Sequence, residues 1–280
     1  MQKVRRTERI VAITKFLMEQ PHRLISLNHF SSLFGTAKST ISEDLGIVKE
    51  AVVNFGIGVI ETLPGVSGGV RYLPYRNMQQ TRAVAKVVCD KLTNPERLIP
   101  GGFLYMSDIL FSPQLMAQVG EVFATKFAAA KPDYILTVET KGIPLAMMTG
   151  QAFNLPVVMV RRGSRVTEGS AVSINYVSGS TKRIQTMSLP RRAVPQGAKV
   201  LIVDDFMKAG GTARGMLELV QEVGAQVVGM GVLVATFEPE EKMVQDYHSL
   251  VILDKVNETA KDIEVRPSQW VVEGDLTCIR

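Results

Sequence analysis

The stretch "LIVDDFMKAGGT", residues 201–212, decides the fold. Its apolar residues lead directly into two adjacent aspartates, Asp204 and Asp205, and a glycine-rich turn follows. Neighbouring carboxylates repel each other, so holding them side by side at a strand end indicates that they bind something. In open α/β sheets, ligands bind beyond the carboxyl ends of the strands. The stretch therefore predicts a strand, a ligand-binding turn and the start of a helix.

The turn itself has the composition of a phosphate site. Gly210 and Gly211 let the backbone approach a phosphate closely, and Thr212 adds a hydroxyl where the helix begins. Helix N-termini attract anions through unpaired N–H groups and the helix dipole. Asp204 and Asp205, just upstream, can accept hydrogen bonds from sugar hydroxyls or bind Mg²⁺ through water. One ligand would then be held at a phosphate and at a vicinal diol; the alternative is that the aspartates only cap a turn.

Outward from this stretch, apolar strands alternate with amphipathic helices. This order predicts a parallel sheet covered by helices on both faces. The expected strands cover 133–139, 156–162, 199–205 and 226–236, and the expected helices cover 77–93, 115–130, 144–153 and 213–224.

Two further segments of this region carry candidate binding residues. "VETKGIP" (138–144) is a short turn with Lys141 and Gly142 that can direct backbone N–H groups at an anion. The polar segment 161–192 contains seven Lys/Arg and little that would be buried. Segments of this length inside an α/β domain are typically functional. We expect either a lid, with Lys182 and Arg183 folding over a pyrophosphate, or a surface ribbon.

The first quarter of the chain has the order of a winged helix. Helices are expected within 5–20, 26–35 and 36–56, and a hairpin within 59–74. Ser26 is a suitable N-cap and Gly35 a suitable helix end. The residues expected to face the core are Ile10, Ile13, Leu17 and Met18, then Leu27, Phe30, Leu33 and Phe34, then Ala37, Ile41, Leu45 and Val48.

Charge favours DNA as the partner of this quarter. Residues 1–76 contain ten Lys/Arg against six Asp/Glu, which is nearly all of the net charge of +5. The third helix would enter the major groove with its polar first turn, and the hairpin would contact the backbone. The predicted DNA-binding residues are Arg5, Arg6, Lys38, Ser39, Thr40, Ser42, Arg71 and Arg76. The alternatives are a protein-binding module and a merely solvated basic surface.

Composition excludes several other classes of protein. An apolar content of 46% supports ordinary cores, and no apolar run is long enough to span a membrane. The basic N-terminus lacks the uninterrupted apolar region of a signal peptide, and Cys89 and Cys278 lack metal-ligand spacing. We therefore expect a cytoplasmic α/β protein with domains at 1–76 and 77–280, no membrane contact and no metal bound directly by side chains.

The motifs bear a definite resemblance to known families. "VLIVDDFMKAGGT" resembles the phosphoribosyl-pyrophosphate (PRPP) motif of type I phosphoribosyltransferases, "TVETKGIP" their pyrophosphate loop, and 161–192 their flexible loop. The run from 113 to 169 is similar to xanthine phosphoribosyltransferases. With the winged helix in front, "STISEDL", "NPERLIPGG", "VSINYVSGS" and "RIQTMSL" make the chain similar to the purine operon repressors of Gram-positive bacteria.

This resemblance implies a dimeric repressor of purine synthesis and transport genes that binds operator DNA and is not an enzyme. PRPP would be the inducing effector, and guanosine polyphosphates would compete for its site. By position, Asp204 and Asp205 would hold the ribose hydroxyls. The pyrophosphate and its Mg²⁺ would face Thr140, Lys141 and Gly142, and the 5′-phosphate would lie in the backbone of Lys208, Ala209, Gly210, Gly211 and Thr212.

One departure from the catalytic motif keeps a second interpretation open. Ala209 stands where transferases commonly have a threonine, and the missing hydroxyl removes one phosphate hydrogen bond, worth roughly 1–3 kcal/mol. This loss weakens binding without abolishing it. The alternative is thus a working purine (xanthine-type) phosphoribosyltransferase with an accessory domain. An activator or an RNA-binding regulator with the same fold also remains open.

Overall fold

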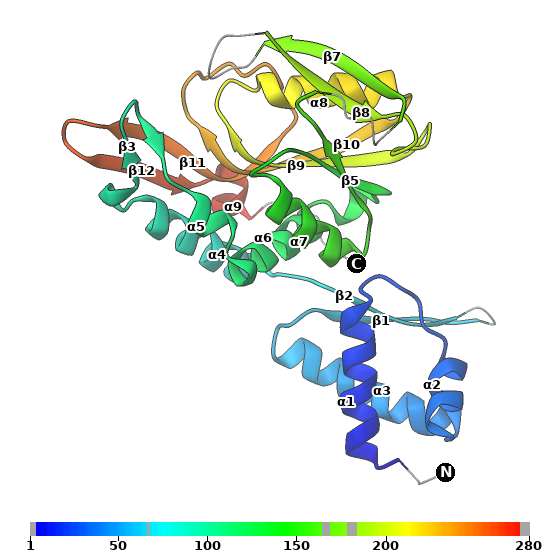
Figure 1. Cartoon of the computed structure of the whole chain (residues 1–280). Coiled ribbons are helices and arrows are strands. Elements are labelled where there is room, and N and C mark those ends of the chain that lie inside the picture. The colour runs from blue at the N-terminus through cyan, green and yellow to red at the C-terminus, as the bar shows by residue number, and fades with distance from the viewer. Residues whose placement is uncertain (1–3, 66–67, 164–168, 178–183, 275–280) are drawn as a thin grey trace. The chain divides into compact units, whose positions relative to one another are not determined.

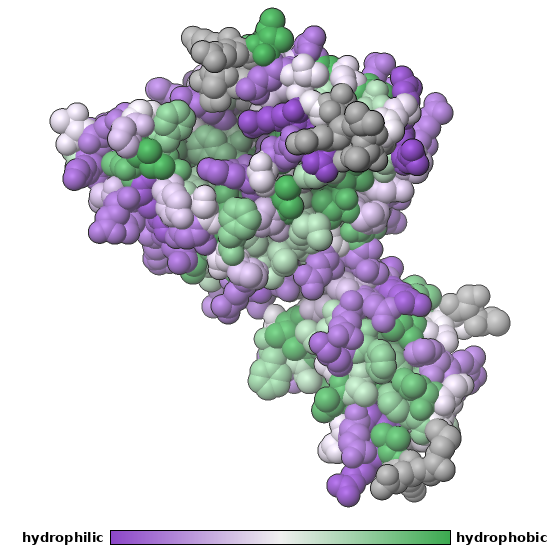
Figure 2. Space-filling model, viewed as in Figure 1, coloured by the Kyte–Doolittle hydropathy of each residue, from purple (hydrophilic) through white to green (hydrophobic). Residues whose placement is uncertain are grey.

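The computed structural model describes residues 4–65, 68–163, 169–177 and 184–274. The chain divides into two compact units, residues 1–77 with 151–154, and residues 78–150 with 155–280 (Figure 1). On the face drawn in Figure 2, hydrophilic and hydrophobic residues intermix over each unit. Within the described ranges, no helix is both long enough and apolar enough to cross a membrane.

The first unit has the predicted order of three helices and a hairpin. It contains α1 (Arg6–Glu19), α2 (Leu27–Phe34), α3 (Lys38–Asn54) and the antiparallel pair β1 (Val59–Leu63) and β2 (Gly69–Leu73). The Ser26 hydroxyl accepts the N–H of His29 at 3.2 Å and so caps α2. Gly35 ends that helix in the left-handed conformation with φ 58°. These two residues set the tight turn between α2 and α3.

Three residues expected in the core of this unit are exposed instead. Met18 lies one position past the buried pair Ile13 and Leu17, which rotates it by about 100° away from the core. Leu33 is exposed because the short helix α2 buries only Phe30 completely. Ala37 is the N-cap of α3, with an extended backbone, so it precedes the apolar face of the helix.

A buried ion pair joins α1 to α3. The Asp44 carboxylate is fully buried and accepts hydrogen bonds from Arg9 Nε at 2.8 Å and Arg6 Nε at 3.1 Å. Arg9 also donates to the carbonyl of Val4 at 3.0 Å. A buried carboxylate is stable when charged partners surround it in this way. The pair therefore fixes the start of α1 against the middle of the third helix.

The second unit is built on a six-stranded sheet. Its order is β12–β11–β10–β9–β5–β6, and all neighbours are parallel except β11 and β12. The strands are β5 (Tyr134–Val138), β6 (Val157–Val160), β9 (Lys199–Met207), β10 (Gln226–Thr236), β11 (His248–Asn257) and β12 (Asp262–Pro267). The sheet is thus mixed, because the last strand, which the sequence interpretation did not place, runs antiparallel at the edge.

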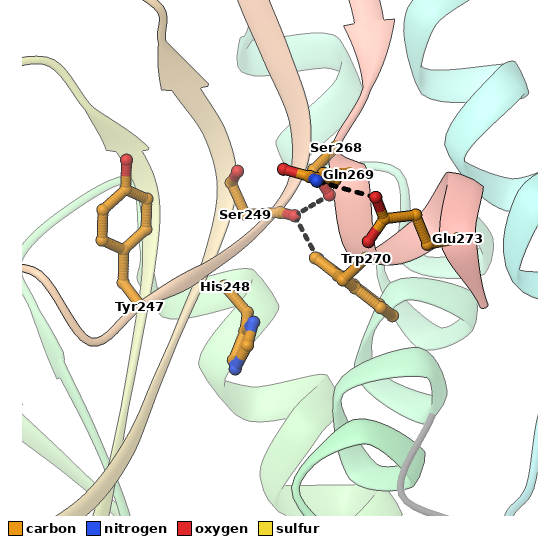
Figure 3. Close-up of a pocket in the computed structure, with 7 residues that line it drawn as sticks. All are labelled: Tyr247, His248, Ser249, Ser268, Gln269, Trp270 and Glu273. Carbon is orange, nitrogen blue, oxygen red and sulfur yellow. Dashed lines mark hydrogen bonds between the residues drawn. The ribbon is translucent and has the colours of Figure 1, made fainter. Parts of the chain in front are cut away.

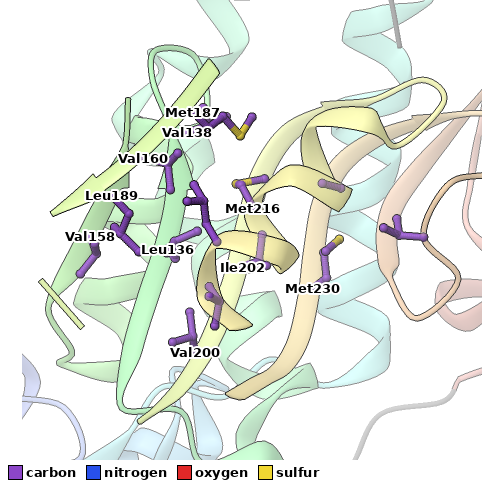
Figure 4. Packing of buried hydrophobic residues seen from close by; sticks show 14 of the residues in the cluster. Leu136, Val138, Val158, Val160, Met187, Leu189, Val200, Ile202, Met216 and Met230 are labelled. Atoms are coloured by element: carbon purple, nitrogen blue, oxygen red, sulfur yellow. The ribbon is translucent and has the colours of Figure 1, made fainter. Parts of the chain in front are cut away.

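Helices cover both faces of this sheet, as predicted. In Figure 1, α8 lies on one face, and α4, α6 and α7 lie on the other. Figure 4 shows Met216 of α8 on the side of the sheet where Ile202 of β9 and Leu136 of β5 lie, and Val200 of β9 belongs to the same cluster. The helices of this unit are α4 (Met78–Leu92), α5 (Ser107–Leu110), α6 (Pro113–Lys126), α7 (Ile143–Phe153), α8 (Gly211–Glu222) and α9 (Gln269–Glu273), and the small hairpin is β3 (Leu98–Ile99) with β4 (Phe103–Leu104).

The polar segment 161–192 differs from its prediction. Residues 171–177 form β7 (Ala171–Val177), which pairs antiparallel with β8 (Ile184–Pro190) in a ribbon that packs on α8. This ribbon buries Val172, Tyr176, Met187 and Leu189, so the expectation that little here would be buried was wrong. These side chains alternate along their strands, because successive residues of a strand point to opposite faces. Lys182 and Arg183 lie outside the described residues.

Candidate functional site

The strand order predicts a ligand-binding crevice at the carboxyl edge of the sheet, between β5 and β9. From β5 the chain passes to β6 on one side, and from β9 it passes to β10 on the other. Neighbouring strands whose connections leave in opposite directions open a crevice where ligands bind. The loop after β5 carries Thr140, Lys141 and Gly142, and the end of β9 carries Asp204 and Asp205. The fold thus brings together two motifs that lie more than sixty residues apart.

Gly142 is the point where the two motifs touch. A Cβ atom at this position would collide with the hydroxyl of Thr137 and would lie 2.7 Å from Asp204 Oδ1. Such separations are too short for any side chain, so only glycine allows the loop to approach the acid this closely. Gly142 is buried, whereas Thr140 and Lys141 are exposed at the loop surface. The loop therefore presents its polar residues outward beside the aspartates.

The two aspartates lie in an environment that disfavours their charge. Asp204 is only 6% exposed, and its Oδ1 accepts the N–H of Asp205 at 2.9 Å. Burial raises the pKa of Asp204 well above its ordinary value, and the adjacent Asp205 carboxylate raises it further. Burial also raises the pKa of Asp205, against an opposing effect from the charge of Lys141. A ligand that supplies hydroxyl donors or a cation would therefore stabilise the charged forms of Asp204 and Asp205 most.

The glycine turn joins the end of β9 to α8. Gly210 is the N-cap of α8 with φ 84°, a backbone conformation that favours glycine. The turn is held from the side by Met243, whose N–H donates to the carbonyl of Ala209 at 2.9 Å. Lys208 is exposed before the turn, and Gly211 and Thr212 occupy the first turn of α8. The first N–H groups of a helix have no partner within the helix, so this helix start is suited to an anion next to the carboxylates.

Sequence interpretation missed the residues that hold the loop after β5. The Arg162 N–H donates to Glu139 Oε1 at 2.6 Å, and Arg161 Nη1 donates to Glu139 Oε2 at 3.5 Å. The charge of Arg162 also lowers the pKa of Asp204 slightly against its overall rise. The pair of arginines that follows β6 was the available signal, since the carboxyl ends of adjacent parallel strands meet at one edge.

The candidate site fits a magnesium-bearing ligand better than a resident metal. Among the described residues, no group of three His, Cys, Asp or Glu side chains is placed to hold a metal ion. Two adjacent carboxylates can instead bind Mg²⁺ through its water molecules, with the ligand's own oxygens completing the coordination. The donor set therefore matches a sugar phosphate that brings Mg²⁺ with it.

Five of the eight predicted DNA-binding residues lie in two elements of the first unit, α3 and the hairpin. Lys38, Ser39 and Ser42 are exposed at the start of α3, and Thr40 is half-buried there. In the hairpin, Arg71 forms an ion pair with Glu61 across β1 and β2. The polar donors of Lys38, Ser39 and Ser42 give the start of α3 a surface suited to a DNA groove.

The remaining predicted residues, near the ends of this unit, have mixed environments. Arg5 is the N-cap of α1, and its backbone N–H donates to Glu8 at 2.8 Å. Arg6 contacts Glu43 at 3.9 Å besides Asp44. Arg76, beyond β2, is half-buried. Arg5 thus has its side chain exposed for a partner, whereas Arg6 divides its charge between two acids.

A separate cavity of about 400 Å³ lies at the opposite edge of the sheet. Figure 3 shows its lining around the start of β11, where Trp270 donates to the carbonyl of Ser249 at 2.6 Å and Gln269 donates to Glu273 at 2.7 Å. These polar groups satisfy one another, and the cavity lies at the amino ends of the parallel strands. It is therefore a weaker candidate than the carboxyl edge.

Comparison with known families assigns each unit a counterpart. Residues 5–74 match the family model of the bacterial purine repressor N-terminal domain. Residues 106–268 match the model of the phosphoribosyl transferase domain. The fold of the second unit is also similar to the crystal structure of adenine phosphoribosyltransferase from Saccharomyces cerevisiae, with a TM-score of 0.52 at 20% identity over 60% of this chain and 98% of the other.

Two relatives match along nearly the whole chain. The purine biosynthesis transcriptional repressor PurR of Bacillus subtilis is 48% identical over 96% of this chain and 94% of its own length. The purine biosynthesis transcriptional activator PurR of Lactococcus lactis is 37% identical over 94% of this chain and 97% of its own length. Both full-length relatives carry the names of transcriptional regulators and not of enzymes.

Proposed function

The chain belongs to the bacterial purine repressor family, DNA-binding regulators of purine biosynthesis that carry a phosphoribosyltransferase domain, and from this premise we propose that PRPP is its effector. In this proposal PRPP binds with Mg²⁺ at the carboxyl edge of the sheet and weakens operator binding. The chain represses genes of purine synthesis and transport when PRPP is scarce. Guanosine polyphosphates compete for the same site, and the acting species is a homodimer.

The observation that carries this proposal is the placement of three motifs at the carboxyl edge of the sheet, where Gly142 approaches Asp204 closely. The diol of a ribose ring suits Asp204 and Asp205, because carboxylates are acceptors and hydroxyls are donors. Its 5′-phosphate suits the helix start at Gly210, and its pyrophosphate suits the loop beside Gly142. PRPP carries one group for each of the three parts of the predicted crevice.

The buried acids make binding selective for a diol with a cation. With their pKa values raised by burial, the aspartates hold their charge at a cost in the free protein. Hydroxyl donors and hydrated Mg²⁺ offset that cost, whereas a simple phosphate supplies only more negative charge. Inorganic phosphate should accordingly bind far more weakly than PRPP with Mg²⁺.

Regulation follows from linkage between the two ligands. If PRPP lowers the affinity for DNA by some factor, DNA must lower the affinity for PRPP by the same factor. We assign repression, and not activation, by the 48% identity to the Bacillus subtilis repressor. An activator would require PRPP to raise transcription without releasing the protein from its DNA.

The test is titration of the protein onto DNA from purine biosynthesis control regions at fixed salt, with and without PRPP and Mg²⁺. We expect tight binding that PRPP weakens at least tenfold. Asp204→Asn should bind the DNA normally and should keep that binding at the PRPP concentration that half-releases the parent chain. Asp90→Asn, which alters an exposed carboxylate on α4, serves as the matched control and should respond like the parent chain.

Each failure of this experiment has a distinct meaning. Unchanged DNA affinity at saturating PRPP would refute the effector assignment while leaving the DNA-binding function intact. Tighter DNA binding with PRPP would reverse the sign of the regulation. Loss of DNA binding in Asp204→Asn would show that this carboxylate supports the fold and not the ligand.

A further inference from the structure

A fully buried hydroxyl lies beside the two predicted binding motifs. Thr137, the fourth residue of β5, is 0% exposed, and its Oγ1 has no hydrogen-bond partner among the described residues. Burying a hydroxyl without a partner is costly, and native proteins retain few such groups without a reason. Valine has the same shape without this cost, and the neighbouring strand positions Val138, Val158 and Val160 are valines.

The position of this hydroxyl connects it to the binding residues. Thr137 Oγ1 and Asp204 Oδ1 are the two side-chain atoms nearest to the point that a Cβ of Gly142 would occupy. The hydroxyl therefore lies beneath the loop after β5 and next to the carboxylate that ends β9. Both oxygen atoms lie within 2.7 Å of that point, so they are close neighbours although no hydrogen bond joins them.

We propose that Thr137 is a positioning residue, whose hydroxyl donates to the Asp204 carboxylate when that carboxylate engages the diol of the ligand. Hydrogen bonds to an ionised acceptor are shorter and roughly twice as strong as neutral ones. The donor lies unpaired in the free protein and gains its partner in the complex. The new hydrogen bond of Thr137 therefore stabilises the complex relative to the free protein. This proposal rests on the proposed effector function.

The test compares Thr137→Val with Thr137→Ser by calorimetric titration of three ligands: PRPP with Mg²⁺, ribose 5-phosphate, and pyrophosphate with Mg²⁺. We expect Thr137→Val to weaken PRPP and ribose 5-phosphate about tenfold each, since both carry the diol. Pyrophosphate lacks the diol and should bind within twofold of the parent value. Thr137→Ser, which keeps the hydroxyl, should bind all three ligands normally.

Thr81 provides a matched control in the same unit. Its hydroxyl is also fully buried without a partner among the described residues, but it lies in α4, which packs against β12 and α9. Thr81→Val and Thr137→Val should each raise the midpoint of thermal unfolding, by about 2–4 °C. Only Thr137→Val should change ligand affinity, and a purely structural role would not produce that split.

Three results would overturn the assignment. These are unchanged PRPP affinity in Thr137→Val, an equal loss for pyrophosphate and ribose 5-phosphate, or a loss in Thr137→Ser as large as that in Thr137→Val. Thr137→Ala supplies a second hydroxyl-free chain if the valine variant does not fold. A parent chain that binds none of the three ligands would refute the effector proposal and this assignment together. Normal parent binding with an unaffected Thr137→Val would refute this assignment alone.

Discussion

The two units each bury a carboxylate, and they treat it in opposite ways. Asp44 of the DNA-binding unit is surrounded by Arg6 and Arg9, which donate to both of its oxygens. Asp204 of the effector unit lies beside a second acid, and no ion pair joins it to a lysine or arginine in the described part of the chain. The charge of Asp44 is therefore compensated within the protein by two arginines. The charge of Asp204 has no such partner, so a bound ligand would have to compensate it.

This difference separates a structural acid from a binding acid more clearly than burial alone does. A buried charge with its partners in place makes a specific contact between elements, and removing one partner leaves the others unpaired. A buried charge without a cation has a shifted pKa and marks a functional site. The same residue type therefore predicts a loss of stability in one unit and a loss of ligand response in the other.

Removal of the structural charge should have the largest effect. Asp44→Asn leaves the buried guanidinium of Arg9 without a counter-charge, so we expect the first unit to lose about 3–5 kcal/mol of stability. Urea unfolding followed by circular dichroism, together with DNA binding, measures this loss. An unfolding free energy within about 1 kcal/mol of the parent value would contradict the structural role assigned to Asp44. Glu43→Gln, on the exposed neighbour, is the control.

Replacement of the binding acid should act on the ligand instead. Asp204→Asn removes charge–diol interactions worth about 1.5–3 kcal/mol, so PRPP affinity should fall about 10- to 150-fold. Stability should stay unchanged or increase, because the cost of a buried charge disappears. Calorimetry with PRPP and thermal unfolding of the same preparation report both quantities. A clear loss of stability without loss of affinity would place Asp204 in the same class as Asp44.

The pH dependence of stability should distinguish the acids in the intact chain. The raised pKa of Asp204 means that the folded protein favours its protonated form. Stability from this residue is therefore lost as pH rises through the raised pKa, and it is recovered as pH falls toward the ordinary value of 3.8. The difference in unfolding free energy between the parent and Asp204→Asn should vary with pH in that window. A difference that stays constant across it would contradict the shift. PRPP binding should weaken as pH falls through the raised pKa of Asp204, because the diol needs the ionised carboxylate.

The smallest effects should come from exposed cations of the DNA-binding unit. Lys38→Ala removes an exposed charge from the start of α3, so we expect weaker DNA binding and a salt dependence shallower by about one unit of slope. Arg71→Ala should have less effect, since Glu61 already neutralises that guanidinium. Fluorescence titration at several salt concentrations compares them. Equal losses in both variants would show that Arg71 leaves its partner for the DNA.

Local features were predictable because their causes lie within a few residues. The Ser26 cap, the Gly35 helix end and the hairpin strands follow from capping and turn chemistry. The positions of β10 and α4 follow from their apolar patterns. At the candidate site, the two loops were predictable from strand order and motif resemblance.

Long-range pairings were not predictable from the sequence. The Asp44 and Arg9 pair joins residues 35 positions apart. Helical spacing places Asp44 beside the buried residues Ile41 and Leu45 of α3, but it does not identify the partner on another helix. The ribbon of β7 and β8 was hidden by the polar residues that alternate with its buried side chains. The role proposed for Thr137 was also not predictable, since only the folded structure shows that its hydroxyl is buried without a hydrogen-bond partner.

The order of the two units along the chain has a consequence for protein synthesis. The helices and hairpin of the DNA-binding unit are complete by Leu73, whereas the effector crevice requires β9 and α8, which end at Glu222. At about 5–20 residues per second, a nascent chain spends roughly 7–30 s with the first part emerged and the second unfinished. In the proposed function, each newly made molecule therefore carries its DNA-binding surface before it can bind PRPP, and control by PRPP begins only when β9 pairs with β5.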